Sequence, residues 1–184
     1  RTLAQEGISY GDIAVLYRSN YLSRGLEKCL LDFRIPYRIY GGIRFYDRAE
    51  IKDSLSYLRL LTPSNPEDPK ELYKNLAIKR IINLPKRGIG NKTMELIETQ
   101  AEHDDTNMYE IIKNYEIGKG KAKASLQAFV QLIEKYRAQV DKISIDQLLE
   151  QLLEESGYLH MLREDKEIER LENIKELISD ISDY

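Results

Sequence analysis

Two segments with apolar residues at helical spacing are joined by Ile82-Asn83-Leu84-Pro85-Lys86-Arg87-Gly88-Ile89-Gly90-Asn91-Lys92-Thr93. The proline and the two glycines predict a tight hairpin between two helices, with the second helix beginning after Gly90. We expect both glycines to allow a positive φ and a close approach of the backbone to a ligand. The first N–H groups of the second helix would face that ligand, and the helix dipole favours an anion there.

The same part of the chain is locally basic. Residues 79–94 carry five cations and no acid, whereas the whole chain has a net charge of −3 and a pI of about 5.6. Residues 145–184 hold twelve acids against four bases. Any basic surface must therefore be local. A nucleic-acid phosphate fits this charge better than a small metabolite does, and the alternative is an ordinary glycine turn with solvated lysines.

The first 42 residues predict a βαβ unit. Asp12–Tyr17 is a continuous apolar run with β-branched residues, which is typical of a buried strand, and Tyr37–Tyr40 predicts a second strand before Gly41-Gly42. Apolar residues at helical spacing lie between them: Leu22, Leu26, Leu30 and Phe33. The two strands should lie parallel in one sheet, and that sheet needs further strands to be stable.

After Gly42 the pattern is helical almost throughout. The expected helices cover roughly residues 48–61, 72–82, 94–101, 108–112, 126–140, 145–153 and 171–181, with Gly157 as a stop. The predicted fold is therefore mainly α: an N-terminal βαβ fragment of a parallel sheet, followed by an all-helical bundle that contains a helix-hairpin-helix-like turn. A chain of 184 residues is long enough for one sizeable core or two small ones.

No catalytic or metal site is predicted. Neither Gly90–Thr93 nor Gly118–Lys121 fits a nucleotide phosphate loop, and Asp104-Asp105 lies in a polar loop. Cys29 is the single cysteine, and no apolar run is long enough to span a membrane. We expect a soluble, cytoplasmic protein, and the first residue, which is not methionine, indicates a fragment.

Four segments resemble, in order, parts of the UvrD/Rep/PcrA superfamily 1 DNA helicases. They are Asp12–Arg24 (DIAVLYRSNYLSR), Ile35–Leu61 (IPYRIYGGIRFYDRAEIKDSLSYLRLL), Ile81–Gly90 (IINLPKRGIG) and Glu169–Leu177 (ERLENIKEL). One departure is Leu22, where the family has glutamine. The resemblance implies that residues 1–42 belong to motor subdomain 2A and residues 43–184 to helical subdomain 2B.

The resemblance further implies a DNA-contacting part of an ATP-dependent 3′–5′ helicase. ATP and magnesium would be held elsewhere in the parent helicase, so this chain would contain no cofactor and would not hydrolyse ATP, since it lacks the Walker motifs. Its partners would be single-stranded and duplex DNA, without sequence specificity, the helicase subdomains 1A, 1B and 2A, and a repair protein. No membrane partner is expected.

Candidate DNA-binding residues fall into two groups. The hairpin group, for duplex DNA, is Lys86, Arg87, Gly88, Ile89, Gly90, Asn91, Lys92 and Thr93. The second group, placed on the single strand by the resemblance, is Arg18, Asn20 and Arg44. Arg18 could instead pair with Asp12 or Asp47.

Two other functions stay open at this point. The acidic helices over 145–184 could make the chain a regulatory protein-interaction module of a repair helicase. The hairpin could also belong to a free-standing helix-hairpin-helix DNA binder, although such a binder has no need of the expected βαβ unit.

Overall fold

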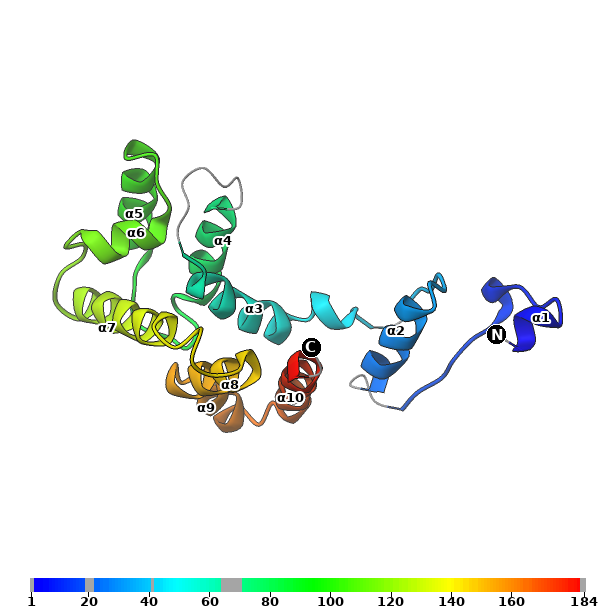
Figure 1. Ribbon diagram of the computed structural model, residues 1–184. Coiled ribbons are helices and arrows are strands. Elements are labelled where there is room, and N and C mark those ends of the chain that lie inside the picture. The colour runs from blue at the N-terminus through cyan, green and yellow to red at the C-terminus, as the bar shows by residue number, and fades with distance from the viewer. Residues whose placement is uncertain (1, 19–21, 41, 64–70, 183–184) are drawn as a thin grey trace.

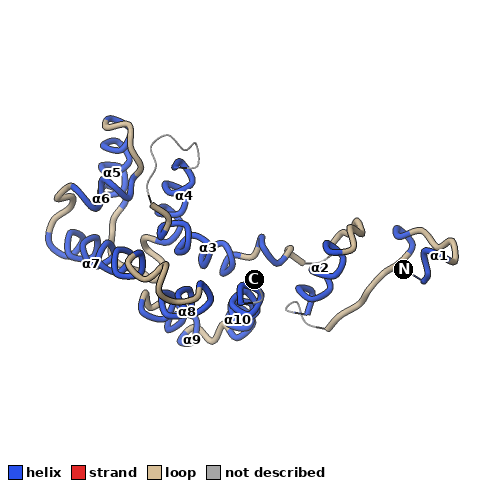
Figure 2. Tube along the Cα trace, in the orientation of Figure 1, coloured by secondary structure: helices blue, strands red, loops and turns tan. Residues whose placement is uncertain are grey.

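The computed structural model describes residues 2–18, 22–40, 42–63 and 71–182. Within these ranges every regular element is a helix (Figures 1 and 2). In chain order the elements are α1 (Thr2–Gln5), the 3-10 turn η1 (Tyr10–Asp12), α2 (Ser23–Asp32), the 3-10 turn η3 (Phe45–Asp47), α3 (Ala49–Leu61), α4 (Glu71–Ile81), α5 (Asn91–His103), α6 (Met108–Asn114), α7 (Gly120–Arg137), α8 (Ile145–Glu155), α9 (Tyr158–Glu164) and α10 (Ile168–Ser182).

The elements from η3 to α10 pack around one apolar core, and we call residues 45–182 the helical body. Helix α3 contacts α4, α7, α8 and α10. Its apolar residues Ile51, Tyr57 and Leu60 are fully buried although they lie on different sides of the helix, because neighbouring helices pack around it. Burying each such side chain contributes roughly 1.5–3 kcal/mol. This packing therefore supplies the rigid support on which the loops between helices are held.

Each helix predicted in the helical body forms, most with boundaries that differ by a few residues, and α9 (Tyr158–Glu164) is a further helix that was not predicted. Helix α3 covers Ala49–Leu61, where helix was expected over 48–61. Helix α8 ends just before Gly157, as expected. Gly157 has a left-handed φ of 81° and is the N-cap residue of α9. Helix α7 begins at Gly120, earlier than the apolar periodicity indicated, because its first turn is polar.

The predicted N-terminal βαβ unit is wrong. The described residues contain no strand, and no backbone hydrogen bond joins residues 13–17 to residues 35–40. Figure 1 shows residues 13–18 as an extended loop that runs from the region of α1 and η1 toward α2. Ile13 has an extended backbone, but Leu16 is 95% exposed. An extended segment becomes a strand only when its N–H and C=O groups pair with a neighbour, and these segments have none.

Helix α2 forms where it was expected, but it meets the helical body through polar side chains. Its buried residues are Ser23, Arg24 and Glu27. Arg24 pairs with Asp180 of α10, and Arg48 donates to the Ser23 hydroxyl at 2.8 Å. We call these five residues the polar junction. It attaches the N-terminal segment next to the C-terminal helix (Figure 1).

Candidate functional site

The hairpin between α4 and α5 is closed by one side chain, that of Asn83. Its amide nitrogen donates to the Ile89 carbonyl at 2.7 Å, and its amide oxygen accepts from the Ile89 N–H at 3.1 Å. Ile89 is buried in the apolar core. Ile89 thus anchors the loop to the core, while Lys86, Gly88 and Gly90 remain exposed.

The two glycines of the hairpin differ in conformation. Gly88 has a φ of 72°, in the left-handed region that favours glycine, as the sequence predicted. Gly90 has φ −79° and ψ 162°, which any residue adopts, so the positive φ expected there is wrong. A Cβ added at Gly90 would meet no atom within 4 Å. Only Gly88 is required for the turn itself.

The N-terminus of α5 is open and positive. Gly90 is its N-cap residue and supplies no side-chain oxygen, and the first turn of the helix contains no acid. The N–H groups of Thr93 and Met94 donate to the Gly90 carbonyl. The first amides of the helix, those of Asn91 and Lys92, therefore face outward at the positive end of the helix dipole.

The five cations of residues 79–94 have separate surroundings. Lys79 forms an ion pair with Glu98 of α5. Arg80 pairs with buried Asp53 of α3 at 2.5 Å. Lys86 and Lys92 are exposed and form no ion pair with any described residue. The mobile positive charge of the hairpin is therefore that of two lysines.

Arg87 points into the protein. Its Nη1 donates to the carbonyls of Ile81, Ile82 and Pro85 at 2.9, 3.1 and 3.3 Å. Its Nη2 donates to the Tyr57 hydroxyl at 3.0 Å and to the Ser156 carbonyl at 3.2 Å. The sequence predicts Arg87, with Lys86, as a phosphate contact, and in the structure its guanidinium lies beneath the hairpin.

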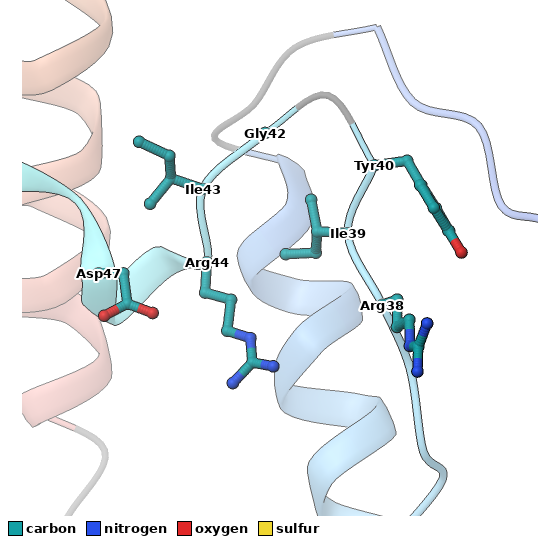
Figure 3. A pocket seen from close by; sticks show the side chains of 7 residues that line it. All are labelled: Arg38, Ile39, Tyr40, Gly42, Ile43, Arg44 and Asp47. Carbon is teal, nitrogen blue, oxygen red and sulfur yellow. The ribbon is translucent and has the colours of Figure 1, made fainter.

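Arg18 and Arg44, two further predicted residues, lie apart from the hairpin. Arg18 is exposed and makes no ion pair with Asp12 or Asp47. Asn20 lies outside the described residues. Arg44 lines an open pocket of about 430 Å³, whose other lining residues are Arg38, Ile39, Tyr40, Gly42, Ile43 and Asp47. Figure 3 shows Ile39 and Ile43 on the two walls of that pocket.

A buried polar network in the helical body was not predicted. Asp53 accepts from the Tyr158 hydroxyl at 2.6 Å, and Arg170 lies 3.6 Å from the same carboxylate. Burial and this hydrogen bond raise the pKa of Tyr158 well above its ordinary value. Asn173 links two further residues of this network: its amide oxygen accepts from Arg48, and its amide nitrogen donates to the Glu50 carboxylate. The only sequence signal was the polar positions among the apolar residues of α3 and α10.

The chain belongs to the family of UvrD-like helicase C-terminal domains, whose model matches residues 1–184. It is similar to the ATP-dependent DNA helicase PcrA of Bacillus subtilis, with 42% identity over 173 residues, which cover 91% of this chain and 22% of the relative. The PcrA helicases of Staphylococcus epidermidis and Staphylococcus aureus are 37% and 36% identical, over 98% of this chain and 24% of each relative.

The chain thus spans about a quarter of the length of the curated relatives it matches. Within the described ranges, no helix has the length and apolar character to cross a membrane. The histidines, cysteine and carboxylates of the same residues form no group of three that could hold a metal ion.

Proposed function

We propose that this chain is the DNA-contacting part of a larger ATP-dependent 3′–5′ DNA helicase, and that its α4–α5 hairpin binds the phosphate backbone of duplex DNA at the junction ahead of the motor. The observation that carries this proposal is the open N-terminus of α5, which exposes backbone amides beside Lys86 and Lys92. Family membership and the similarity to PcrA helicases support it.

The proposed chemistry is independent of DNA sequence. A phosphate oxygen would accept from the N–H groups of Asn91 and Lys92, with the Thr93 hydroxyl nearby and with the two lysines as mobile counter-charges. Gly88 and Gly90 would let the phosphate approach closely, because neither has a Cβ. Ile89 would hold the loop in place through its burial in the core.

The proposal divides the chain near residue 42. Residues 1–42 would belong to motor subdomain 2A, and residues 43–184 would form subdomain 2B. In support, the apolar core begins at Phe45. Arg18, Asn20 and Arg44 would contact the single strand. ATP and magnesium would be held by the rest of the full-length protein, and this chain alone would not hydrolyse ATP. Further partners would be subdomains 1A and 1B and a repair protein.

The test is the salt dependence of duplex binding by the full-length protein. Each lost phosphate contact lowers the log–log slope by about 0.9, so Lys86→Ala and Lys92→Ala should each flatten it by about that amount. Lys175→Ala is the matched control, because Lys175 is an exposed lysine on α10 that is paired with Glu172. Slopes that stay at the wild-type value in both hairpin variants would show that the DNA face lies elsewhere.

A further inference from the structure

We propose that Arg87 is the positioning residue of the hairpin: it fixes the start of α5 relative to α4 and α8, and it does not bind phosphate itself. The inference rests on the proposed function for its consequence in DNA binding. Its structural part rests on this chain alone. Of the two adjacent cations, Lys86 would face the ligand and Arg87 would support the loop.

The guanidinium of Arg87 lies at the C-terminal end of α4. Helix α4 ends at Ile81, and the carbonyls of Ile81 and Ile82 accept from Nη1 of Arg87, as does that of Pro85. The last carbonyls of a helix have no partner within the helix and carry its negative dipole end. The guanidinium donates to the Ile82 carbonyl, adds a second donor to the Ile81 carbonyl, which also accepts from the Leu84 N–H at 3.0 Å, and its charge opposes the dipole.

Arg87 also contacts residues that lie far from it in the chain. Nη2 of Arg87 donates to the carbonyl of Ser156, the C-cap residue of α8, so the same guanidinium lies at the ends of two helices. It also donates to the Tyr57 hydroxyl of α3, which in turn donates to the Leu84 carbonyl of the hairpin at 2.8 Å. The guanidinium carbon lies 5.2 Å from the ring centre of Phe129 on α7. One side chain therefore ties the hairpin to α3, α4, α7 and α8.

The backbone of Arg87 is held as well. Its carbonyl accepts from the Ser125 hydroxyl of α7 at 2.9 Å. Together with the Asn83–Ile89 pair, this fixes the chain on both sides of Gly88. Both terminal nitrogens of the guanidinium already donate to the protein, so a phosphate could reach them only by breaking these bonds. Lysine cannot replace this arrangement, because its ammonium lacks the planar fork of donors.

The structural arm of the test measures hydrogen exchange of the peptide covering residues 83–93 in the full-length protein without DNA. Arg87→Lys keeps the charge and loses the fork, and we expect about tenfold or more faster exchange in this peptide, since hydrogen bonds to charged groups are lost. Arg163→Lys is the matched control: Arg163 pairs with Glu154 on the surface, and its replacement should leave the peptide unchanged.

Tyr57→Phe keeps the test decisive if Arg87→Lys unfolds the protein. It removes one neutral partner of the guanidinium and the bond to Leu84, so exchange in the peptide should rise about two- to tenfold. Exchange at the wild-type rate in Arg87→Lys, or in Tyr57→Phe where Arg87→Lys does not fold, would overturn the inference.

The DNA arm separates this inference from the proposed function. Arg87→Lys should weaken duplex binding about tenfold, although its charge is unchanged. Weaker binding with wild-type exchange would place Arg87 on the phosphate and overturn the inference. If Lys86→Ala and Lys92→Ala leave the salt slope unchanged, the proposed DNA site fails, whereas the exchange result still decides the role of Arg87 in the hairpin.

Discussion

The helical body is held together by apolar side chains, whereas α2 is attached to it by polar ones. Helices α3, α4 and α8 meet through residues such as Tyr57, Ile78 and Leu149, all fully buried. The buried residues of α2 are Ser23, Arg24 and Glu27, and apolar side chains such as Leu31 are exposed. Both regions contain regular helices with similar apolar periodicity, so periodicity alone does not reveal what a helix packs against.

This difference has an energetic consequence. Apolar burial is non-directional, and its contribution grows with the area removed from water. The polar junction depends on particular donors and acceptors, and losing one of them leaves a buried group unsatisfied. In the junction, Arg24 donates to the Tyr46 hydroxyl at 2.9 Å as well as pairing with Asp180. We therefore expect the body to determine global stability and the junction to determine the position of α2.

The largest expected effect is on the apolar core. Leu152→Ala in α8 removes a fully buried side chain and should lower the free energy of unfolding by about 2–5 kcal/mol. Leu26→Ala in α2 should change it by less than about 0.5 kcal/mol, because that side chain is 36% exposed. Urea denaturation of both variants measures the difference. Equal losses would mean that α2 contributes to the same core.

The polar junction should respond locally. Asp180→Ala removes the partner of Arg24 and of Lys28, so amide exchange over residues 23–32 should rise about tenfold, at a nearly unchanged midpoint of global unfolding. Glu172→Ala, which breaks an exposed pair on the same helix, is the control. Exchange mass spectrometry measures both. A lower global midpoint with no local change in α2 would contradict the separation of the two regions.

The smallest effect is expected where polar contacts lie outside both the core and the junction. Hydrogen bonds from Gln100, His103 and Tyr115 lower the pKa of Asp104 from 3.8 to about 2. Because the folded pKa lies below the unfolded one, the contribution of this group is present above pH 3.8 and is lost as the pH falls through about 2. Tyr115→Phe removes one donor at 2.7 Å and should raise the pKa toward its ordinary value.

Carboxyl chemical shifts followed by NMR through this pH range measure the pKa of Asp104 in both proteins. We expect only a small decrease in the urea midpoint at neutral pH, because the group is at the surface. A pKa that is unaffected by Tyr115→Phe would show that the tyrosine hydroxyl does not donate to this carboxylate in solution.

The hairpin shows how far sequence reasoning reached. The proline, the glycines and the flanking periodicity predicted the turn, the start of α5 and the left-handed φ of Gly88, all of which depend on neighbouring residues. The same reasoning gave Lys86 and Arg87 one role. The two side chains have different surroundings because Arg87 contacts Ser156 and Tyr57. These residues lie far away in the chain and come close only through packing.

The N-terminal segment shows the opposite limit. Its β-branched run indicated a strand, but a strand requires a partner, and local preference cannot supply one. The helices, by contrast, satisfy their own backbone groups within a few residues.

The sequence by itself determined the helices of the helical body other than α9, the position of the hairpin and the local positive charge, because each arises from short-range spacing and composition. Only the tertiary structure decided which cations remain exposed, which one is held beneath the hairpin, and how α2 is attached. Those outcomes depend on hydrogen bonds between residues distant in the chain, and their energies depend on burial, which no local pattern encodes.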